Sequence, residues 1–274
     1  MVAGIPYAVR SDVHGRVDLS RRQFEQASAY AGLFDLGDVE AMHIDRDHPL
    51  RHGQSKGERT IDVIMRNAIR SEGGLTDIAK ETVQGVLTSI NDMKHHLRDD
   101  GEKGFCYRGI AGNAAAAWTE IFRAIASPDQ QRRLREYFDG FDDEFDVIRE
   151  CAMEQVNGSI VLYLPWGASS ETLRAALSEL DGYDPAKIVV LSHDYLTGAS
   201  LKPEWQREVK PMQSGELAVG ALDYLAQRDC DIVVCYGHIG FEYGPAEVRF
   251  RHGRREMTAY HTDEKGGSLL RIEL

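Results

Sequence analysis

The chain has 274 residues, which is enough to bury a substantial core in one large domain. Its formal net charge of -12 argues against a general affinity for nucleic acid or anionic membranes, although a local basic patch, and with it a nucleic-acid partner, stays open. No apolar run approaches the roughly 20 residues that span a bilayer, and the first residues lack the basic-then-apolar pattern of a secretion signal. We therefore expect one cytoplasmic domain over residues 1–274, with no membrane partner.

The beginning of the chain predicts a β-α-β unit and then a loop. Apolar runs at 5–9 and 33–37 favour strands, and the helical spacing of apolar residues over 19–31 favours a helix between them. Residues 39–57 are polar and contain proline and glycine, so they predict a long loop over the strand ends. Loops of this length are often functional.

A helical block follows that loop. Residues 58–97 predict two amphipathic helices, one on each side of Gly73-Gly74. The apolar face of an amphipathic helix has to be covered by a core, another helix or a partner. We interpret the block as a helical insertion outside the main core that caps the site or forms a homo-oligomer contact.

The remainder of the chain alternates between strands and helices. Strands are predicted at 105–112, 147–156, 159–164, 187–192, 231–236 and 269–274, and helices at 114–126, 129–138, 170–180 and 215–227. Asn157-Gly158 is a strong signal for a two-residue hairpin turn, although residues 147–156 are also compatible with the end of a helix. The acidic segment 139–146 predicts a solvated connector. The tail alternates around His252-Gly253, which predicts antiparallel edge strands.

Four cysteines are scattered along the chain, and none forms a C-x-x-C pair. They are too few and too dispersed for a disulfide framework. Cys106 and Cys235 lie in predicted strands, where a buried, reduced thiol is the favoured interpretation over a zinc ligand.

Residues that commonly bind metals follow five of the predicted strands. Alternation along an extended segment places Asp12 and His14 on the same side of the chain after the first strand. In open α/β sheets, ligands bind outside the carboxyl ends of the strands, so five such ends converge on one rim. Each residue alone is typical of a capping carboxylate or a core histidine, whereas the set together favours a metal centre. The set consists of Asp12, His14, Asp38, Asn113, His193 and His238.

The same residues resemble a known motif series. Asp12-Val13-His14, Gly37-Asp38, Gly112-Asn113, His193 and Gly237-His238 are similar to the successive motifs of the calcineurin-like metallophosphoesterases, in the same order and over nearly the whole chain. Leu164-Pro165-Trp166 and the turn Ser192-His193-Asp194 also resemble family members with extended sequences. The resemblance implies an α/β fold, a four-layer αββα sandwich of two mixed β-sheets flanked by helices, here with a helical insertion at 58–97.

The resemblance also implies a function. It assigns Asp12 and His14 to a first metal, Asn113, His193 and His238 to a second, and Asp38 to a bridging position. Oxygen and imidazole donors of this kind accept manganese, iron, zinc or magnesium. Two such cations about 3.5–4 Å apart clamp a phosphate ester and ionise the water between them, so that a bridging hydroxide attacks. The expected substrate is a phosphodiester or a nucleotide-type ester, and the expected catalytic residues are Asp38, Asn113 and His238.

Two positions depart from the family pattern. Ala114 stands where the family has a histidine that helps the leaving group, and Gly240 stands where it has a further histidine ligand of the first metal. Loss of an acid–base group typically lowers the rate by about 10²–10⁴. We therefore expect the second metal site to be the stronger, and a degenerate member acting as a binding or regulatory subunit is the alternative. Candidate replacement ligands, each more typical of a solvated side chain, are His43, Asp45, Asp47, His48, His52, Glu242, His252 and His261.

Overall fold

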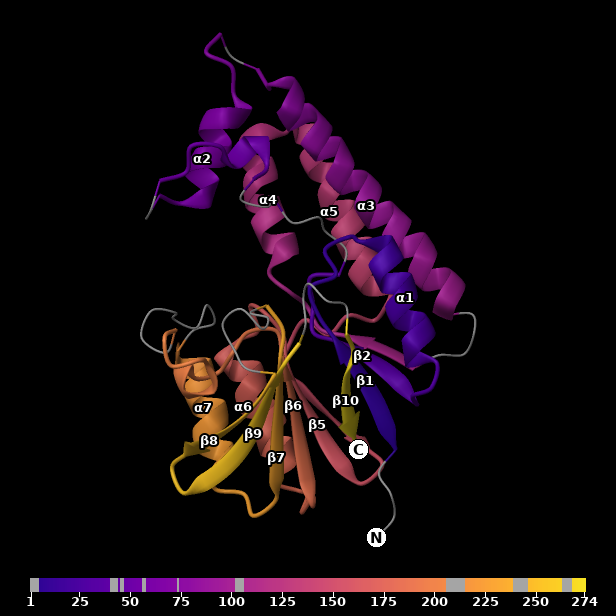
Figure 1. Cartoon of the computed structure of the whole chain (residues 1–274), viewed down its shortest axis with the longest axis vertical. Coiled ribbons are helices and arrows are strands. Elements are labelled where there is room, and N and C mark those ends of the chain that lie inside the picture. The colour runs from indigo at the N-terminus through magenta and orange to yellow at the C-terminus, as the bar shows by residue number, and fades with distance from the viewer. Residues whose placement is uncertain are drawn as a thin grey trace.

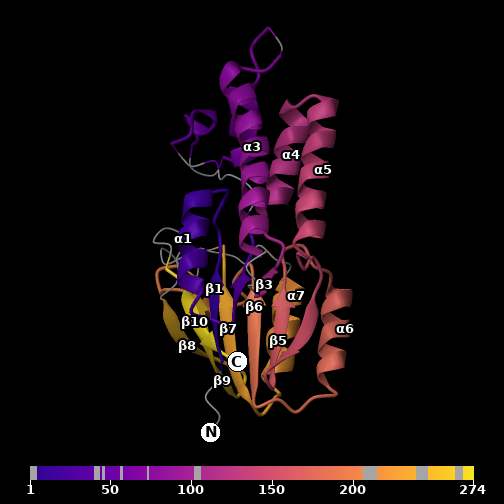
Figure 2. The same cartoon turned by 90° about the vertical axis from the view of Figure 1, so that its right-hand side faces the viewer.

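The computed structural model describes residues 5–39, 44, 47–55, 58–72, 74–101, 106–205, 215–238, 246–262 and 268–274. Within these residues, strands form two mixed sheets with helices on both outer faces and a group of helices beyond one end, as Figures 1 and 2 show. The α/β architecture expected from the sequence, two packed sheets between helical layers, is confirmed.

The smaller sheet has four strands in the order β10-β1-β2-β3. Its members are β1 (Pro6–Arg10), β2 (Gly32–Asp35), β3 (Cys106–Gly109) and β10 (Leu270–Glu273). The first three are parallel, and β10 pairs with β1 antiparallel at the edge of the sheet. The carboxyl ends of β1, β2 and β3 therefore lie at the same end of this sheet.

The larger sheet has six strands in the order β4-β5-β6-β7-β9-β8. Its members are β4 (Ala152–Val156), β5 (Ser159–Leu164), β6 (Lys187–Ser192), β7 (Asp231–Tyr236), β8 (Glu247–His252) and β9 (Arg255–His261). The four inner strands are parallel, and β4 and β8 are antiparallel edges. In the predicted tail, β8 and β10 are thus edge strands, whereas β9 lies inside the sheet.

The two sheets pack face to face through alternate apolar residues. Val9 and Phe34 of the smaller sheet meet Val161, Val189 and Cys235 of the larger one in a continuous buried cluster. The outer face of the larger sheet is covered by α6 (Ser170–Leu180) and α7 (Gly215–Leu225). On the outer face of the smaller sheet, α1 (Val17–Ala27) supplies Phe24 and Ala27. Because neighbouring residues of a strand point to opposite faces, both faces of each sheet are apolar.

A second apolar core holds together four helices, which we call the helical extension. They are α2 (Thr60–Ala68), α3 (Asp77–Gly101), α4 (Ala114–Ile125) and α5 (Pro128–Glu144). Ile64, Val86, Trp118 and Phe138, one from each helix, belong to one buried cluster. A short helix in the preceding loop, Pro49–Arg51, adds Leu50 to this cluster. The extension therefore includes residues 114–144 in addition to the block expected at 58–97.

The helix α3 belongs to two layers at once. Its first half packs in the helical extension through Val83 and Val86, while Met93 and Leu97 pack with Ala8 and Leu33 against the smaller sheet. The carboxyl end of the block at 58–97 thus packs against the smaller sheet, and its role as a cap or an oligomer contact stays a prediction. Figure 2 shows α3 running from the far end of the extension down to the sheets.

The structure confirms the expected hairpin turn at Asn157-Gly158 but not the expected connector at 139–146. The Asn157-Gly158 turn is confirmed, with φ of 50° and 85°, and residues 152–156 form a strand rather than the end of a helix. The acidic segment 139–146 is not a solvated connector, because α5 continues through it to Glu144. Ser127 and Gln130 form a capping box at the start of α5, and Phe141 gives its later turns a buried side chain, 1% exposed.

Among the described residues, no helix combines the length and the apolar composition that crossing a bilayer requires.

Candidate metal centre

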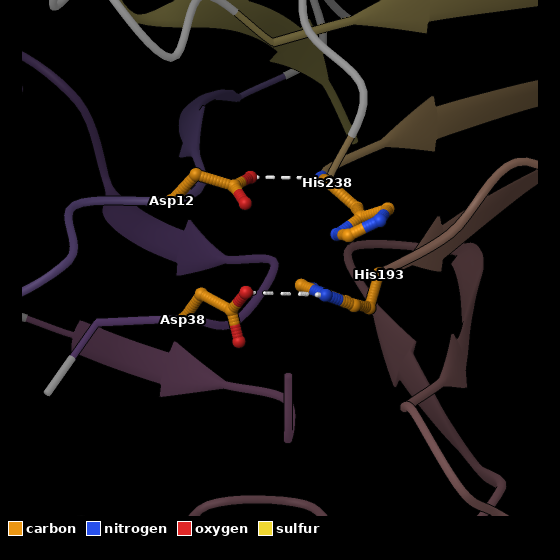
Figure 3. A group of neighbouring side chains, drawn as sticks. All are labelled: Asp12, Asp38, His193 and His238. Atoms are coloured by element: carbon orange, nitrogen blue, oxygen red, sulfur yellow. Dashed lines mark hydrogen bonds and ion pairs between the residues drawn. The ribbon is translucent and has the colours of Figure 1, made fainter. Parts of the chain in front are cut away.

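Four side chains from four strand ends meet where the two sheets adjoin. Asp12 follows β1, Asp38 follows β2, His193 follows β6 and His238 follows β7. One ligand atom from each lies within 4.8 Å of those of the other three. Figure 3 shows the two carboxylates on one side and the two imidazoles on the other. Both carboxylates are buried, with Asp12 1% and Asp38 2% exposed, and His193 is fully buried.

The backbone reaches this arrangement through left-handed conformations. Asp12, His14, Asp38 and His238 have φ between 51° and 58°, a region that residues other than glycine seldom adopt. Such conformations persist only where the surrounding structure enforces them, and they concentrate at functional sites. The expectation that Asp12 and His14 share a side because their segment is extended is wrong, since each of these two residues turns the chain out of the extended conformation.

The two loops of the smaller sheet are hydrogen-bonded to each other along the rim. The Asp12 N–H donates to Gly37 O at 3.0 Å, and the His14 N–H donates to Asp38 O at 2.7 Å. Arg16 binds the turn from outside, with its guanidinium donating to Asp12 O and Val13 O at 2.8 Å each. The backbone of Asp12 and that of Asp38 are therefore held side by side, although 26 positions separate them in the sequence.

Glycines before three of the ligand-type residues permit the close packing of the loops. A Cβ at Gly37, whose φ is 102°, would lie 2.7 Å from the Gly112 Cα. At Gly112 it would lie 2.8 Å from Cγ of Asp38 and closer still to Oδ1 of that carboxylate. At Gly237 it would lie 3.1 Å from the His193 carbonyl oxygen and closer to the Ser11 hydroxyl. The glycines in Gly-Asp, Gly-Asn and Gly-His thus bring three backbone segments into contact.

In each carboxylate, one oxygen accepts a backbone N–H. Oδ2 of Asp12 accepts the His238 N–H at 2.8 Å and the Ser11 hydroxyl. Oδ1 of Asp38 accepts the N–H of Ala114 at 2.7 Å, at the first turn of α4. The amino end of a helix carries exposed N–H groups without partners inside the helix, and Asp38 accepts from one of them. These hydrogen bonds fix the orientation of both carboxylates.

The hydrogen bonds of His193 define which of its nitrogens is available. Nδ1 lies 2.6 Å from Leu36 O, a group that only accepts, so Nδ1 carries the proton. Nε2 faces the other ligand-type residues: the Asn113 N–H lies 3.3 Å from it, Oδ1 of Asn113 2.7 Å and Oδ2 of Asp38 3.6 Å. A histidine whose other nitrogen donates to a backbone carbonyl is the usual arrangement for a metal ligand.

His14 and Asn113 lie at the margins of the four-residue group. His14 Nε2 is 3.6 Å from Oδ1 of Asp12, and Asn113 contacts His193. The structure thus places all six predicted residues on one rim, with four of them in a single group. Buried carboxylates are normally paired with cations or coordinate metals, and here carboxylate oxygens face imidazole nitrogens. The donor set therefore fits a divalent cation of the manganese, iron or zinc type.

A buried ion pair beneath the rim was not predicted from the sequence. Arg10 donates from Nε to Asp35 Oδ2 at 2.5 Å, and both side chains are fully buried. Nη1 of the same guanidinium donates to Ser20 at 2.7 Å, and Ser20 in turn is 2.8 Å from Nε2 of His96 on α3. Burial raises the pKa of the Asp35 carboxyl, and the adjacent Arg10 charge opposes that effect. The sequence signal that could have indicated this ion pair is Arg10 itself, a charged residue in the otherwise apolar strand β1.

Where they are described, the replacement ligands suggested for the first metal do not belong to the four-residue group. His48 binds Leu50 N within the loop that joins the helical extension. His252 pairs with Asp223 at 2.7 Å, at the turn between β8 and β9 and so at the opposite end of the sheet. His261 ends β9 beside Tyr236, with ring centroids 5.3 Å apart, and thus lies at the same end of the sheet as the centre but outside the four-residue group. His52 and Asp47 are exposed near the extension, and His43, Asp45, Gly240 and Glu242 lie outside the described residues.

Comparison with known proteins gives a limited result. No protein-family model matches the sequence, and no curated protein matches it. A structure of YfcE, a phosphoesterase from E. coli, is similar over 98% of this chain and 88% of that chain, with 13% identity and a TM-score of 0.33. A metallophosphoesterase from Sphaerobacter thermophilus is similar over 68% of this chain and 60% of that chain, with 12% identity and a TM-score of 0.27. Similarity at these identities and TM-scores does not assign a function to this chain.

Proposed function

We propose that the protein is a metal-dependent phosphoesterase that hydrolyses a phosphodiester or a nucleotide-type phosphate ester. The observation that carries this proposal is the group of Asp12, Asp38, His193 and His238, whose ligand atoms lie within 4.8 Å of one another. Two carboxylates and two imidazoles at the carboxyl ends of strands are a donor set for divalent cations. The motif order described above supports the same class of reaction.

The ligands divide between two cations in this proposal. His193, His238 and Asn113 would hold the second cation, Asp12 and His14 would hold the first, and both would share Asp38. The second site has more protein donors than the first, so it binds its cation more tightly. When bound, the cations supply the positive charge that polarises a phosphate ester and activates water near neutral pH.

The other residues of the rim orient this set and limit the choice of substrate. The Ala114 N–H and the Leu36 carbonyl hold Asp38 and His193 in the required directions. The methyl group of Ala114, 7% exposed, has no proton to donate to a leaving group. Esters whose leaving groups depart without protonation are therefore favoured, which is the reason to prefer activated diesters and nucleotide-type esters.

The same alanine supports a second candidate function. A rim that binds cations but has no acid at position 114 also suits a binding or regulatory subunit that recognises a phosphate group without hydrolysing it. The two candidates share the metal centre and differ only in turnover. Measurement of metal content and of hydrolysis on the same preparation therefore separates them.

The test compares histidines inside and outside the centre. Metal-free protein is supplied with Mn²⁺ and assayed with bis(4-nitrophenyl) phosphate, and His238→Ala is compared with His252→Ala, whose histidine lies at the other end of the sheet. We expect Mn²⁺-dependent release of nitrophenolate that is lost in His238→Ala and kept in His252→Ala. Metal binding without hydrolysis selects the regulatory candidate. Absence of metal binding to the unaltered protein refutes both.

A further inference from the structure

Trp166 lies on the same rim as the metal centre but is not a ligand. It follows β5, which is parallel to β6, and its backbone N–H donates to Ala111 O at 2.8 Å, just before Gly112 and Asn113. Its indole ring approaches the His193 imidazole edge-on, with centroids 6.3 Å apart and planes at 79°. At this rim the neighbouring strand β6 leads to His193, and β3 of the smaller sheet leads to Asn113, whereas β5 leads to an aromatic ring.

The surroundings of this tryptophan differ from those of a core residue. Trp166 is partly exposed and belongs to none of the four buried apolar clusters. Trp118, by contrast, is 3% exposed and packs against Phe122 in the helical extension. Next to Trp166, a Cβ at Gly167 would meet no atom within 4 Å. Because the ring is partly exposed and lies outside these clusters, burial in the core does not explain its position.

The residues between Trp166 and Asp38 are small. Ala111, Gly112 and Ala115 are partly exposed, and Ala114 presents only a methyl group. Among the described residues, none accepts a hydrogen bond from the indole N–H, which leaves that donor available at the rim. Trp166 therefore offers an aromatic surface and an N–H donor on the rim that holds the metal centre.

We propose that Trp166 is the stacking surface for a planar aromatic or heterocyclic group of the phosphate ester. This inference rests on the proposed function, since it requires the phosphate to bind at the metal centre, and it names the substrate class more narrowly. Stacking of a base on an aromatic side chain contributes about 5- to 150-fold in affinity and tolerates different bases, because every base has a π-face. A nucleobase and a simple aryl group share this chemistry.

The test measures binding to the Mn²⁺-loaded protein by calorimetry, with ligands matched in pairs. Adenosine 5′-phosphate is compared with ribose 5-phosphate, and phenyl phosphate with ethyl phosphate, so each pair differs in the planar group. The variants are Trp166→Leu, which removes the aromatic face, and Trp166→Phe, which keeps one. Tyr183→Leu serves as the matched control, since Tyr183 is a 37% exposed aromatic that precedes the opposite end of β6.

We expect the unaltered protein and Tyr183→Leu to prefer the planar member of at least one pair by about 5-fold or more. Trp166→Leu loses that preference while its affinity for ribose 5-phosphate stays the same, and Trp166→Phe keeps part of it. Preference in the adenosine pair alone identifies a base, and preference in both pairs identifies any aromatic group. Equal binding within both pairs, or an unchanged preference in Trp166→Leu, overturns the inference and leaves the proposed function intact. No binding of any of the four phosphates to metal-loaded protein overturns both.

Discussion

Gly112→Ala should disrupt the metal centre without removing any ligand. Gly112 does not have a positive φ, so an alanine there is not strained by its backbone. Its Cβ, however, would lie 2.8 Å from Cγ of Asp38, closer still to Oδ1, and against the Asp38 backbone nitrogen. Ordinary contact begins at 3.4 Å, so the Asp38 carboxylate has to move by about 1 Å.

That displacement sets the expected magnitudes. Misplacement of a reacting group by about 1 Å lowers rates by about 10²-fold, and overpacking a tight contact costs about 1–3 kcal/mol of folding free energy. Because the hydrogen bond from Ala114 N–H to Asp38 Oδ1 has the same oxygen as acceptor, it weakens as well. We therefore expect weaker Mn²⁺ binding in calorimetry, a slower Mn²⁺-dependent reaction and a lower unfolding temperature.

Gly220→Ala is the matched control, because a Cβ at this position in α7 meets only Leu173 Cδ2, at 3.8 Å. Replacing a glycine inside a helix with alanine stabilises it by up to about 1 kcal/mol, so this variant should bind Mn²⁺ as the unaltered protein does. If Gly112→Ala binds Mn²⁺ with unaltered affinity and unfolds at the same temperature, the close approach of Gly112 to Asp38 does not exist in solution.

Three further predictions concern the rest of the molecule. Arg10→Met should lower the free energy of unfolding by about 3–5 kcal/mol in urea titrations, because it leaves the buried Asp35 without its partner; a change below about 1 kcal/mol would show that the pair is not buried. Burial raises the pKa of the Cys151 thiol to about 11, so at pH 8 only about 10⁻³ of it is thiolate. Cys106 is exposed, so the expectation that its thiol is buried is wrong, and iodoacetamide followed by mass spectrometry should label it first. Labelling of Cys151 should rise with pH, and early labelling of Cys151 would contradict its burial. Titration of metal-free protein with Mn²⁺ should give either two binding steps of different affinity or a single binding step. The tighter binding step should be lost in His238→Ala. Two equally tight sites in the unaltered protein would show that a further residue completes the first site.

The positions of the site residues could be predicted because they follow strands. Asp38, His193 and His238 each come directly after a short apolar run, and parallel strands bring such positions to one rim wherever the intervening helices lie. Whether each of them binds a metal stays a prediction. The conformation that brings Asp12 and His14 together was not predictable, because a left-handed φ depends on contacts with residues 37–39, which are distant in the sequence.

The packing of the helices also depends on contacts between residues that are distant in the sequence. Apolar periodicity predicted both helices of the block at 58–97, but it could not show which partner each face has. Val83 and Met93 are both apolar positions on α3, yet the first packs against other helices and the second against the smaller sheet. The acidic composition of residues 139–146 predicted a solvated connector. The segment is helical up to Glu144 instead, and Phe141 within it is buried. Long-range packing determined both results.

The central claim is that Asp12, Asp38, His193 and His238 bind divalent cations. The most direct measurement is anomalous scattering from crystals of protein purified without chelator and supplied with Mn²⁺, with an elemental count on the same sample. The account predicts an anomalous peak between the carboxylates and the imidazoles, with at least about one cation per chain bound to these donors. A map without a peak among these four side chains, together with an elemental count near zero, would contradict it.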